Sequence, residues 1–194
     1  MCGRYSFETE IGALITAWKL AQQRMVYEKQ EEVRPTDRAP VLFSDGQLRL
    51  LRWGFSPAYT KAPLINARGE TAVEKRTFRN AFLKRRCIVP ATGFYEWKKG
   101  EGKQKEKHLF QGEEPFLAMA GLWEVFLIDG EETPCFTILT TAATDAMEGI
   151  HDRMPVLLQP QERTLYLNHR ALSDARWKEM LNQQEIRLYS RMVD

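Results

Sequence analysis

The sequence has few of the residues that hold disulfide-rich or metal-binding domains together. Its three cysteines, Cys2, Cys87 and Cys135, are an odd number and lie far apart in the chain. They form neither a disulfide framework nor a Cys-x-x-Cys zinc motif. The three histidines add no local pair of ligands, so a zinc site has little support. We therefore expect no metal site.

Signals for membranes and nucleotides are also missing. No apolar run approaches the ~18 residues of a membrane helix. The N-terminus is not a basic segment followed by an apolar one, as a signal peptide would be. No G-x-G-x-x-G, phosphate-binding loop, G-x-S-x-G or H-E-x-x-H motif is present. We expect a cytoplasmic protein with no membrane partner and no cofactor.

What is present is the composition of one globular domain. The 194 residues are 43% hydrophobic and 28% charged, and no linker or repeat divides them, so we expect a single domain over residues 1–194. The net charge is +2, yet the segment from Lys75 to His108 holds eleven Lys or Arg residues and three acids. Such a segment suits an anionic polymer as partner. A solvated helix face followed by a lysine-rich turn explains it at least as well.

Strand signals outnumber helix signals along the chain. Asp45-Gly46 between two β-prone runs predicts a hairpin over 41–53, and apolar residues at i, i+3, i+4 and i+7 predict a helix over 8–30. The pattern as a whole predicts an α+β fold with a mostly antiparallel, barrel-like β core and peripheral helices. The other predicted elements are helices at 70–86 and 173–182, strands at 87–90, 93–97, 116–126, 135–143, 156–158 and 186–193, and a turn or loop at 98–107. The strands at 116–126 and 135–143 are joined by Asp129-Gly130-Glu131-Glu132.

The most unusual feature is a cysteine directly behind the initiator methionine. If Met1 is removed, Cys2 carries an α-amine and a thiol on adjacent carbons. The amine has a reference pKa of about 7.7–8.0 and can attack an aldehyde, after which the thiol can close a five-membered thiazolidine ring. The residue alone favours the plainer alternative of a frayed terminus without a function.

Three further segments carry polar residues suited to catalysis. His151, in Gly-Ile-His-Asp-Arg-Met-Pro, is the first candidate for a histidine acid or base. Glu96 lies among aromatic residues on a predicted strand, where apolar neighbours would raise its pKa. Asn66, Arg68 and Glu70 alternate, so an extended backbone would put an amide and a guanidinium on one side to position a polar terminus and a phosphate. Taken singly, each is explained about as well or better by a structural or solvent-facing role.

Taken together, six motifs in order closely resemble the SOS response-associated peptidase (SRAP) family of abasic-site processing proteins. The resemblance runs from residue 2 to about Leu158. One departure lies before the first hairpin, where the family commonly has Asn-hydrophobic-Ala-Pro and this chain has Glu32-Val33-Arg34-Pro35. The six motifs are Met1-Cys2-Gly3-Arg4-Tyr5, Arg52-Trp53-Gly54-Phe55, Leu64-Ile65-Asn66-Ala67-Arg68-Gly69-Glu70-Thr71, Gly93-Phe94-Tyr95-Glu96-Trp97, Thr140-Thr141-Ala142-Ala143 and Ile150-His151-Asp152-Arg153-Met154-Pro155.

The resemblance implies a fold, a partner and a reaction. We expect a monomer with a positively charged groove for single-stranded DNA that contains abasic sites, acting on bacterial or phage DNA. Family members lose their initiator methionine, by autoproteolysis, and the exposed cysteine forms a thiazolidine crosslink with the ring-opened sugar; lyase activity is also implied. The catalytic residues map to Cys2, Asn66, Glu96 and His151. The expected DNA-binding residues are Arg4, Arg68 and Arg153, with Trp53 and Phe55 as a wedge where the base is missing.

Two other functions stay open at this point. One is a thiol peptidase that acts in trans, with Cys2 as nucleophile and His151 as base. The other is a non-covalent module for single-stranded DNA that uses only the basic segment. Only the covalent hypothesis predicts a heat-stable adduct with an abasic oligonucleotide.

Overall fold

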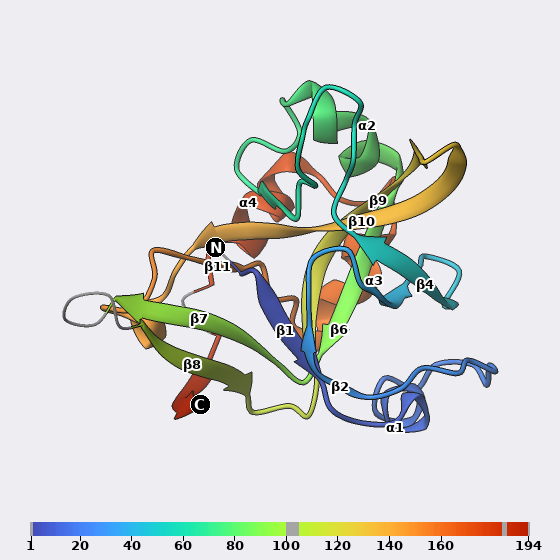
Figure 1. Cartoon of the computed structure of the whole chain (residues 1–194). Helices are drawn as coiled ribbons and strands as arrows, with labels where there is room; N and C mark the ends of the chain where they lie inside the picture. The colour runs from blue at the N-terminus through green and yellow to red at the C-terminus, as the bar shows by residue number, and fades with distance from the viewer. Residues whose placement is uncertain (1, 100–104, 184–185, 194) are drawn as a thin grey trace.

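The computed structural model describes residues 2–99, 105–183 and 186–193, which contain two β-sheets (Figure 1). The smaller sheet has the strand order β12-β8-β7-β1-β2, and all its pairings are antiparallel. It places the N-terminal strand between two others, so the first residues of the chain are held by the sheet. Its strands are β1 (Arg4–Phe7), β2 (Gln30–Val33), β7 (Gly93–Lys99), β8 (Lys105–Gly112) and β12 (Leu188–Val193).

The larger sheet closes on itself. Its order is β11-β10-β4-β3-β6-β9, and β9 also pairs with β10, so five strands form a ring. All pairings are antiparallel except those of β10 with β4 and with β5. This confirms the predicted α+β fold with a mostly antiparallel, barrel-like core. The strands are β3 (Arg38–Leu42), β4 (Leu48–Trp53), β5 (Asn66–Arg68), β6 (Arg86–Ala91), β9 (Leu117–Ile128), β10 (Glu131–Ala142) and β11 (Arg153–Pro155).

Two tight turns build this ring, both at the predicted positions. In the β3–β4 turn, Asp45 Oδ1 accepts a hydrogen bond from the Gln47 amide at 3.0 Å, and Gly46 has a φ of +78°. In the β9–β10 turn, Asp129 and Gly130 have φ angles of +52° and +85°. Asp and Gly are favoured where a short hairpin demands left-handed backbone, which explains why these signals were readable in the sequence.

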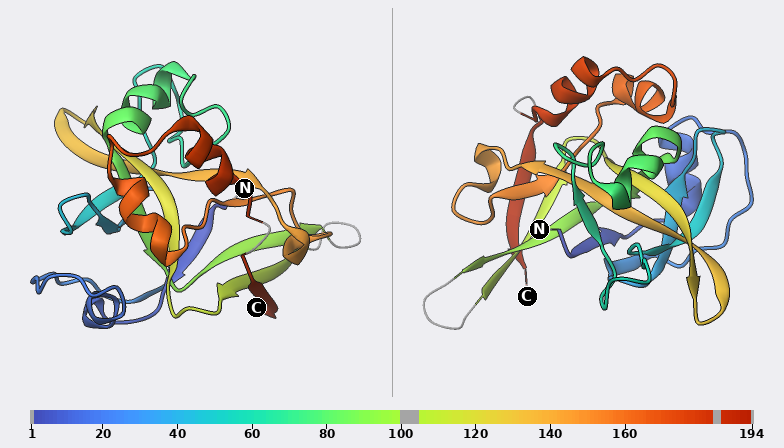
Figure 2. Two further views of the ribbon diagram at one scale, coloured as in Figure 1. Left: turned by 180° about the vertical axis from the view of Figure 1, so that it is seen from behind. Right: turned by 90° about the horizontal axis from the view of Figure 1, so that it is seen from above.

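Three of the four α-helices in the described residues, the second to the fourth, gather on one flank of the ring (Figure 2). Aromatic contacts hold them together: the Trp177 ring centroid lies 5.2 Å from that of Phe82 and 5.7 Å from that of Tyr166. No helix of the described residues is both long and apolar enough to cross a membrane. The helices are α1 (Ile11–Ala17), α2 (Arg76–Lys84), α3 (Pro160–Leu167) and α4 (Asp174–Leu181).

The predicted helix over 8–30 is wrong beyond its first part. α1 ends at Ala17, and Lys19 takes the left-handed conformation with a φ of +53°. Gln23 then binds the β3–β4 hairpin, where its side chain accepts from the Leu48 amide at 2.7 Å and donates to the Gly46 carbonyl at 3.3 Å. Tertiary hydrogen bonds therefore replace the helical ones in this segment.

Other boundaries also differ from the sequence prediction. The turn expected at 98–107 is partly strand, since β7 reaches Lys99 and β8 begins at Lys105; residues 100–104 lie outside the described residues. The strand expected at 156–158 is reduced to an isolated bridge between Leu157 and Met119. Helix α3 was not predicted, although its proline at the first position and the capping bond from the Gln159 amide to Glu162 at 2.8 Å are typical start signals.

Candidate active site at the N-terminus

Cys2 is fully buried just before β1, and one hydrogen bond ties it to the other sheet. The Asn66 side chain, at the start of β5, donates from Nδ2 to the Cys2 carbonyl at 2.8 Å. Pairing of β5 with β10, where Asn66 is opposite Ile138, fixes the position of this amide. The other end of the amide, Oδ1, is buried without a hydrogen-bond partner among the described residues. It can therefore accept a hydrogen bond from a group that enters the site.

Glu96 lies on β7, next to β1, and is 3% exposed. Desolvation by burial raises the pKa of this carboxyl above its ordinary value, although the charge of His151 opposes the shift. Burial first, and then the negative charge of Glu96, raise the pKa of the Cys2 thiol well above its ordinary value. The site therefore holds a protonated thiol beside a carboxyl group that keeps its proton to a higher pH than usual.

His151 completes the group from the loop between the 3₁₀ helix η1 (Asp145–Met147) and β11. Its Nε2 lies 4.0 Å from Glu96 Oε2. On the other side of the ring, Nδ1 accepts a hydrogen bond from the Arg153 amide at 3.0 Å. Four segments that are distant in sequence thus bring Cys2, Asn66, Glu96 and His151 together, and a catalytic role for each stays a prediction.

The buried carboxyl of Glu96 makes a testable contribution to stability. A carboxyl with a higher pKa in the folded than in the unfolded protein binds its proton more tightly when folded. The free energy of unfolding therefore falls as the pH rises through the interval between the two pKa values, and it stays lower above that interval. We expect Glu96→Gln, which removes the charge, to raise the melting temperature at pH 8 above that of the wild type.

Calorimetry or circular dichroism at pH 4 and pH 8 tests this expectation. The gain of the Glu96→Gln variant over the wild type should shrink toward pH 4, where both side chains are neutral. Glu148→Gln, a change at an exposed glutamate, serves as the matched control and should show no comparable pH-dependent gain. A melting temperature of Glu96→Gln below that of the wild type at pH 8 would contradict the prediction.

Two of the expected DNA-binding arginines lie near this site. Arg68 is exposed on β5, two residues after Asn66 and on the same face of the strand. Arg4 is half-buried on β1; its Nη1 donates to the Gly3 carbonyl at 2.9 Å, and its Nε lies 3.5 Å from Glu32 Oε2. Both arginines are therefore close in sequence to a residue of the group, and a phosphate contact by either stays a prediction.

The expected aromatic wedge is contradicted by the structure. The side chains of Trp53 and Phe55 are both 0% exposed. Trp53 packs in the core against Tyr5 and Phe136, and its Nε1 donates to the Ile65 carbonyl at 2.9 Å. Aromatic residues at the end of a strand are found in protein cores as well as in binding loops. Here both side chains belong to the core.

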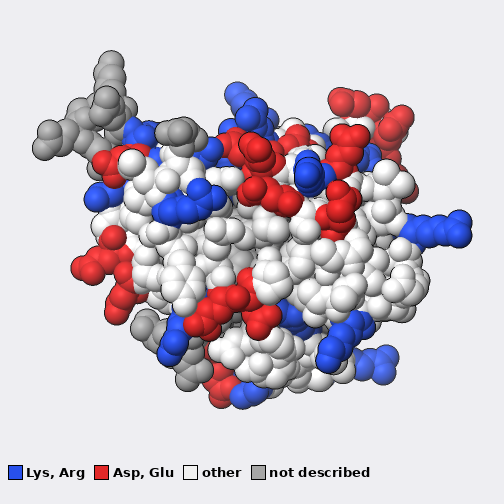
Figure 3. Space-filling view, turned by 90° about the horizontal axis from the view of Figure 1, so that it is seen from below, with Lys and Arg blue, Asp and Glu red and all other residues white. Residues whose placement is uncertain are grey.

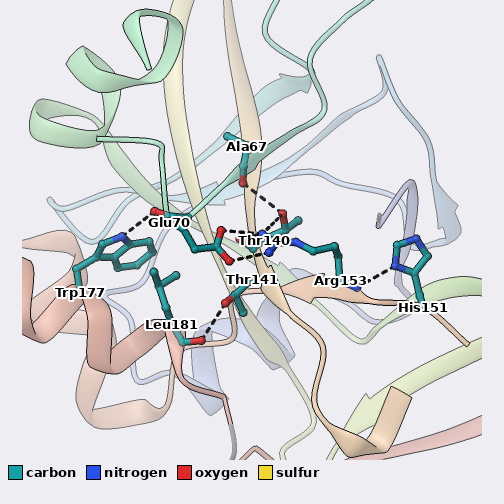
Figure 4. Close-up of polar contacts among 9 residues, drawn as sticks. Ala67, Glu70, Thr140, Thr141, His151, Arg153, Trp177 and Leu181 are labelled. Carbon is teal, nitrogen blue, oxygen red and sulfur yellow. Dashed lines mark hydrogen bonds and ion pairs between the residues drawn. The ribbon is translucent and has the colours of Figure 1, made fainter. Parts of the chain in front are cut away.

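Arg153 is bound by groups within the protein. Its guanidinium forms a bidentate ion pair with Glu70, at 2.6 Å and 2.8 Å, and Nη2 also donates to the Thr140 carbonyl at 2.7 Å (Figure 4). These partners occupy both terminal nitrogens of the guanidinium, and a phosphate contact by Arg153 stays a prediction. The sequence alone does not predict this partner of Glu70, because no local spacing connects residues 70 and 153.

The basic segment does not form one basic surface. Arg86 is 3% exposed and donates to the carbonyls of Phe82, Tyr166 and Asn168. Arg85 pairs with Glu124, and Lys107 pairs with Glu32. On the face drawn in Figure 3, acidic and basic side chains lie next to one another. Among the described residues of this segment, the charge is therefore divided among the core, ion pairs, the exposed side of α2 and exposed lysines of β7 and β8, Lys98 and Lys105. Within the described part of the chain, no cluster of His, Cys, Asp and Glu could hold a metal ion.

The fold and the group around Cys2 define a β-rich protein with its candidate chemistry at the chain's N-terminus. The family model for SOS response associated peptidase (SRAP) matches residues 1–194, and the chain belongs to this family. Abasic site processing protein YoqW of Bacillus subtilis is 35% identical over 180 residues, which cover 87% of this chain and 80% of that protein. Abasic site processing protein YedK of Escherichia coli is 36% identical over 110 residues, 56% of this chain and 50% of that protein.

Solved structures show the same architecture. A protein from Bacteroides thetaiotaomicron superposes with a TM-score of 0.84 at 26% identity, over 100% of this chain and 92% of that one. A phage-related protein from Bordetella bronchiseptica superposes with a TM-score of 0.77 at 26% identity, over 99% of this chain and 94% of that one.

Proposed function

We propose that this protein acts on abasic sites in single-stranded DNA by joining its N-terminal cysteine covalently to the ring-opened sugar. One observation carries the proposal: Cys2 lies beside an amide, a buried carboxyl and an imidazole that come from three other segments. The relatives from Bacillus subtilis and Escherichia coli, both named abasic site processing proteins, support the same substrate.

The proposed reaction uses both functional groups of Cys2 after removal of Met1. The lone pair of the α-amine attacks the aldehyde carbon of the open sugar, and loss of water leaves an imine. The thiol sulfur then bonds to the imine carbon while its proton passes to the nitrogen, which closes the thiazolidine ring. The sugar carbon is then held by both nitrogen and sulfur, which makes the adduct durable.

Each neighbouring side chain has a role in this scheme. Asn66 holds the terminus through the Cys2 carbonyl, and its unpartnered Oδ1 can accept from the amine or from a sugar hydroxyl. Glu96, with its raised pKa, can both take and return a proton at the amine. His151 protonates the ring oxygen of the sugar as the ring opens. Removal of Met1 by the same groups, and strand cleavage by β-elimination from the imine, are the further parts of the proposal.

A thiol peptidase acting in trans fits the site less well. Such an enzyme needs a thiolate that is exposed to substrate and paired with a histidine. Here the thiol is fully buried, and burial and the charge of Glu96 raise its pKa. A protonated thiol suits the second step of the covalent scheme, in which the sulfur gives up its proton only as the ring closes.

A denaturing gel with a single-stranded oligonucleotide that contains one abasic site tests the proposed function. We expect a heat-stable adduct whose mass equals protein without Met1 plus oligonucleotide minus one water. An oligonucleotide whose abasic aldehyde has been reduced with borohydride is the matched control and should give no adduct. An abasic site deep inside a duplex should react more slowly. Adduct formation with the reduced site, or no adduct with the single strand, would overturn the proposal.

A further inference from the structure

We infer that Glu70 and Arg153 are positioning residues that set the orientation and the tautomer of the His151 ring. Neither side chain needs to touch DNA in this role. The importance of the ring for the reaction rests on the proposed function, whereas its orientation and tautomer are properties of the protein alone.

Arg153 connects His151 to the strands that carry the rest of the site. Its backbone amide donates to His151 Nδ1 at 3.0 Å, while its guanidinium binds Glu70 and the carbonyl of Thr140 (Figure 4). Thr140 belongs to β10, where it is opposite Arg68 of β5. The guanidinium also holds the pKa of Glu70 below its usual range, as expected for a paired carboxylate. The residue that supplies the hydrogen bond to the imidazole is thus tied to its surroundings twice, by its guanidinium and by the pairing of its backbone with Ala142 of β10.

The hydrogen bond to Nδ1 selects one neutral form of the ring. Because Nδ1 accepts the Arg153 amide, the proton of the neutral imidazole must lie on Nε2, which is the nitrogen that faces Glu96. Asp152 Oδ1 also lies 3.0 Å from Nδ1, but an unprotonated nitrogen cannot donate to it. That second contact belongs to the doubly protonated ring. The loop therefore offers an acceptor to His151 when it takes up a proton.

The Glu70–Arg153 ion pair also links the loop that carries His151 to the strand that carries Asn66. Glu70 follows β5, and the Gly69 amide between them donates to the Thr140 carbonyl at 2.8 Å. Helix α4 supports this turn, because Trp177 Nε1 donates to the Gly69 carbonyl at 3.0 Å. A break in the Glu70–Arg153 pair would therefore loosen the link between the amide that holds Cys2 and the imidazole.

Removal of Glu70 should leave the protein folded. The Glu70 side chain is 40% exposed, and ion pairs that are open to solvent contribute little to stability. Changes at this residue thus separate positioning from folding. Glu70→Ala removes both carboxylate acceptors of the guanidinium and leaves only those of Thr140, whereas Glu70→Gln keeps one side-chain oxygen and should have an intermediate effect. Asp45→Asn breaks another bidentate arginine–carboxylate pair, with Arg49, on the distant β3–β4 hairpin and serves as the matched control.

The first measurement is the nitrogen NMR spectrum of the histidine side chains in the protein without DNA. The sequence has three histidines, so His151→Gln identifies the signals of His151. At a pH where the ring is neutral, we expect the Nε2–H form in the wild type and in Asp45→Asn. In Glu70→Ala we expect a mixture with the Nδ1–H form. An unchanged tautomer in Glu70→Ala would overturn the inference, whether or not the wild type forms an adduct.

The second measurement compares reaction and binding. We expect Glu70→Ala to slow adduct formation roughly 10- to 100-fold, because small misplacements of a catalytic group cost rates of that order. The dissociation constant for an undamaged single strand should change less than about twofold. Tighter DNA binding by Glu70→Ala would instead show that the released Arg153 contacts phosphate. An unchanged rate despite an altered tautomer would overturn the link to the reaction. Absence of an adduct from wild-type protein would reject the proposed function only.

Discussion

Changing Cys2 to alanine should abolish the durable DNA adduct while leaving DNA binding intact. After removal of Met1, this variant keeps an α-amine, so it can still form an imine with the abasic aldehyde. It lacks the sulfur that closes the ring, and the imine reverts by hydrolysis or cleaves the strand by β-elimination. A denaturing gel should therefore show no heat-stable band, whereas borohydride added during the reaction should trap the imine.

The same experiment separates the amine from the thiol. A protein with a cleavable extension before Cys2 has an amide at this nitrogen, whose delocalised lone pair does not form an imine. It should crosslink only after the extension is cut, as checked by intact mass. Cys135→Ala, which changes another buried cysteine, is the matched control and should react like the wild type. Equal crosslinking before and after cutting would show that the α-amine of Cys2 is not the attacking group.

Trp53→Ala should unfold the protein at a much lower temperature. Its side chain is fully buried between Tyr5, at a centroid distance of 5.1 Å, and Phe136, at 6.2 Å. Truncating such a residue costs about 3–5 kcal/mol, which corresponds to a fall in melting temperature on the order of 10 °C for this length. Trp53→Phe keeps most of the packing and loses the hydrogen bond to Ile65, so its cost should be smaller.

The same variants test whether Trp53 is a core residue or a wedge that enters DNA. Tyr59→Ala, at an aromatic residue that is 70% exposed, is the matched control and should change the melting temperature little. Thermal melts of the three variants, together with DNA binding at a temperature where all are folded, give the answer. If Trp53→Ala melted like the wild type but lost DNA binding, its side chain would have to leave the core, and the wedge would be restored.

Features with a local physical cause could be predicted from the sequence. Asp45-Gly46 and the turn at Asp129-Gly130 supply the left-handed backbone that hairpins need, so both hairpins were placed correctly. Ser173 accepts from the Arg176 amide and starts α4, as its position before a periodic segment indicates. The family resemblance likewise depended on short motifs whose order is visible in the chain. The α+β class and the four candidate catalytic residues came from signals of this kind.

Features that depend on distant partners were decided only by the tertiary structure. Trp53 and Phe55, expected as a wedge, are core residues, because the packing of the tertiary structure encloses both side chains. The ion pair of Arg153 with Glu70 joins two residues that are far apart in the chain, and no local spacing predicts it. The helix expected through residue 30 ends at Ala17, and Gln23 instead binds the β3–β4 hairpin, which lies about 25 residues further along the chain. By itself the sequence determined which groups could do the chemistry. The fold determined which are exposed and which neighbours direct them, because both depend on residues that are distant along the chain and adjacent in space.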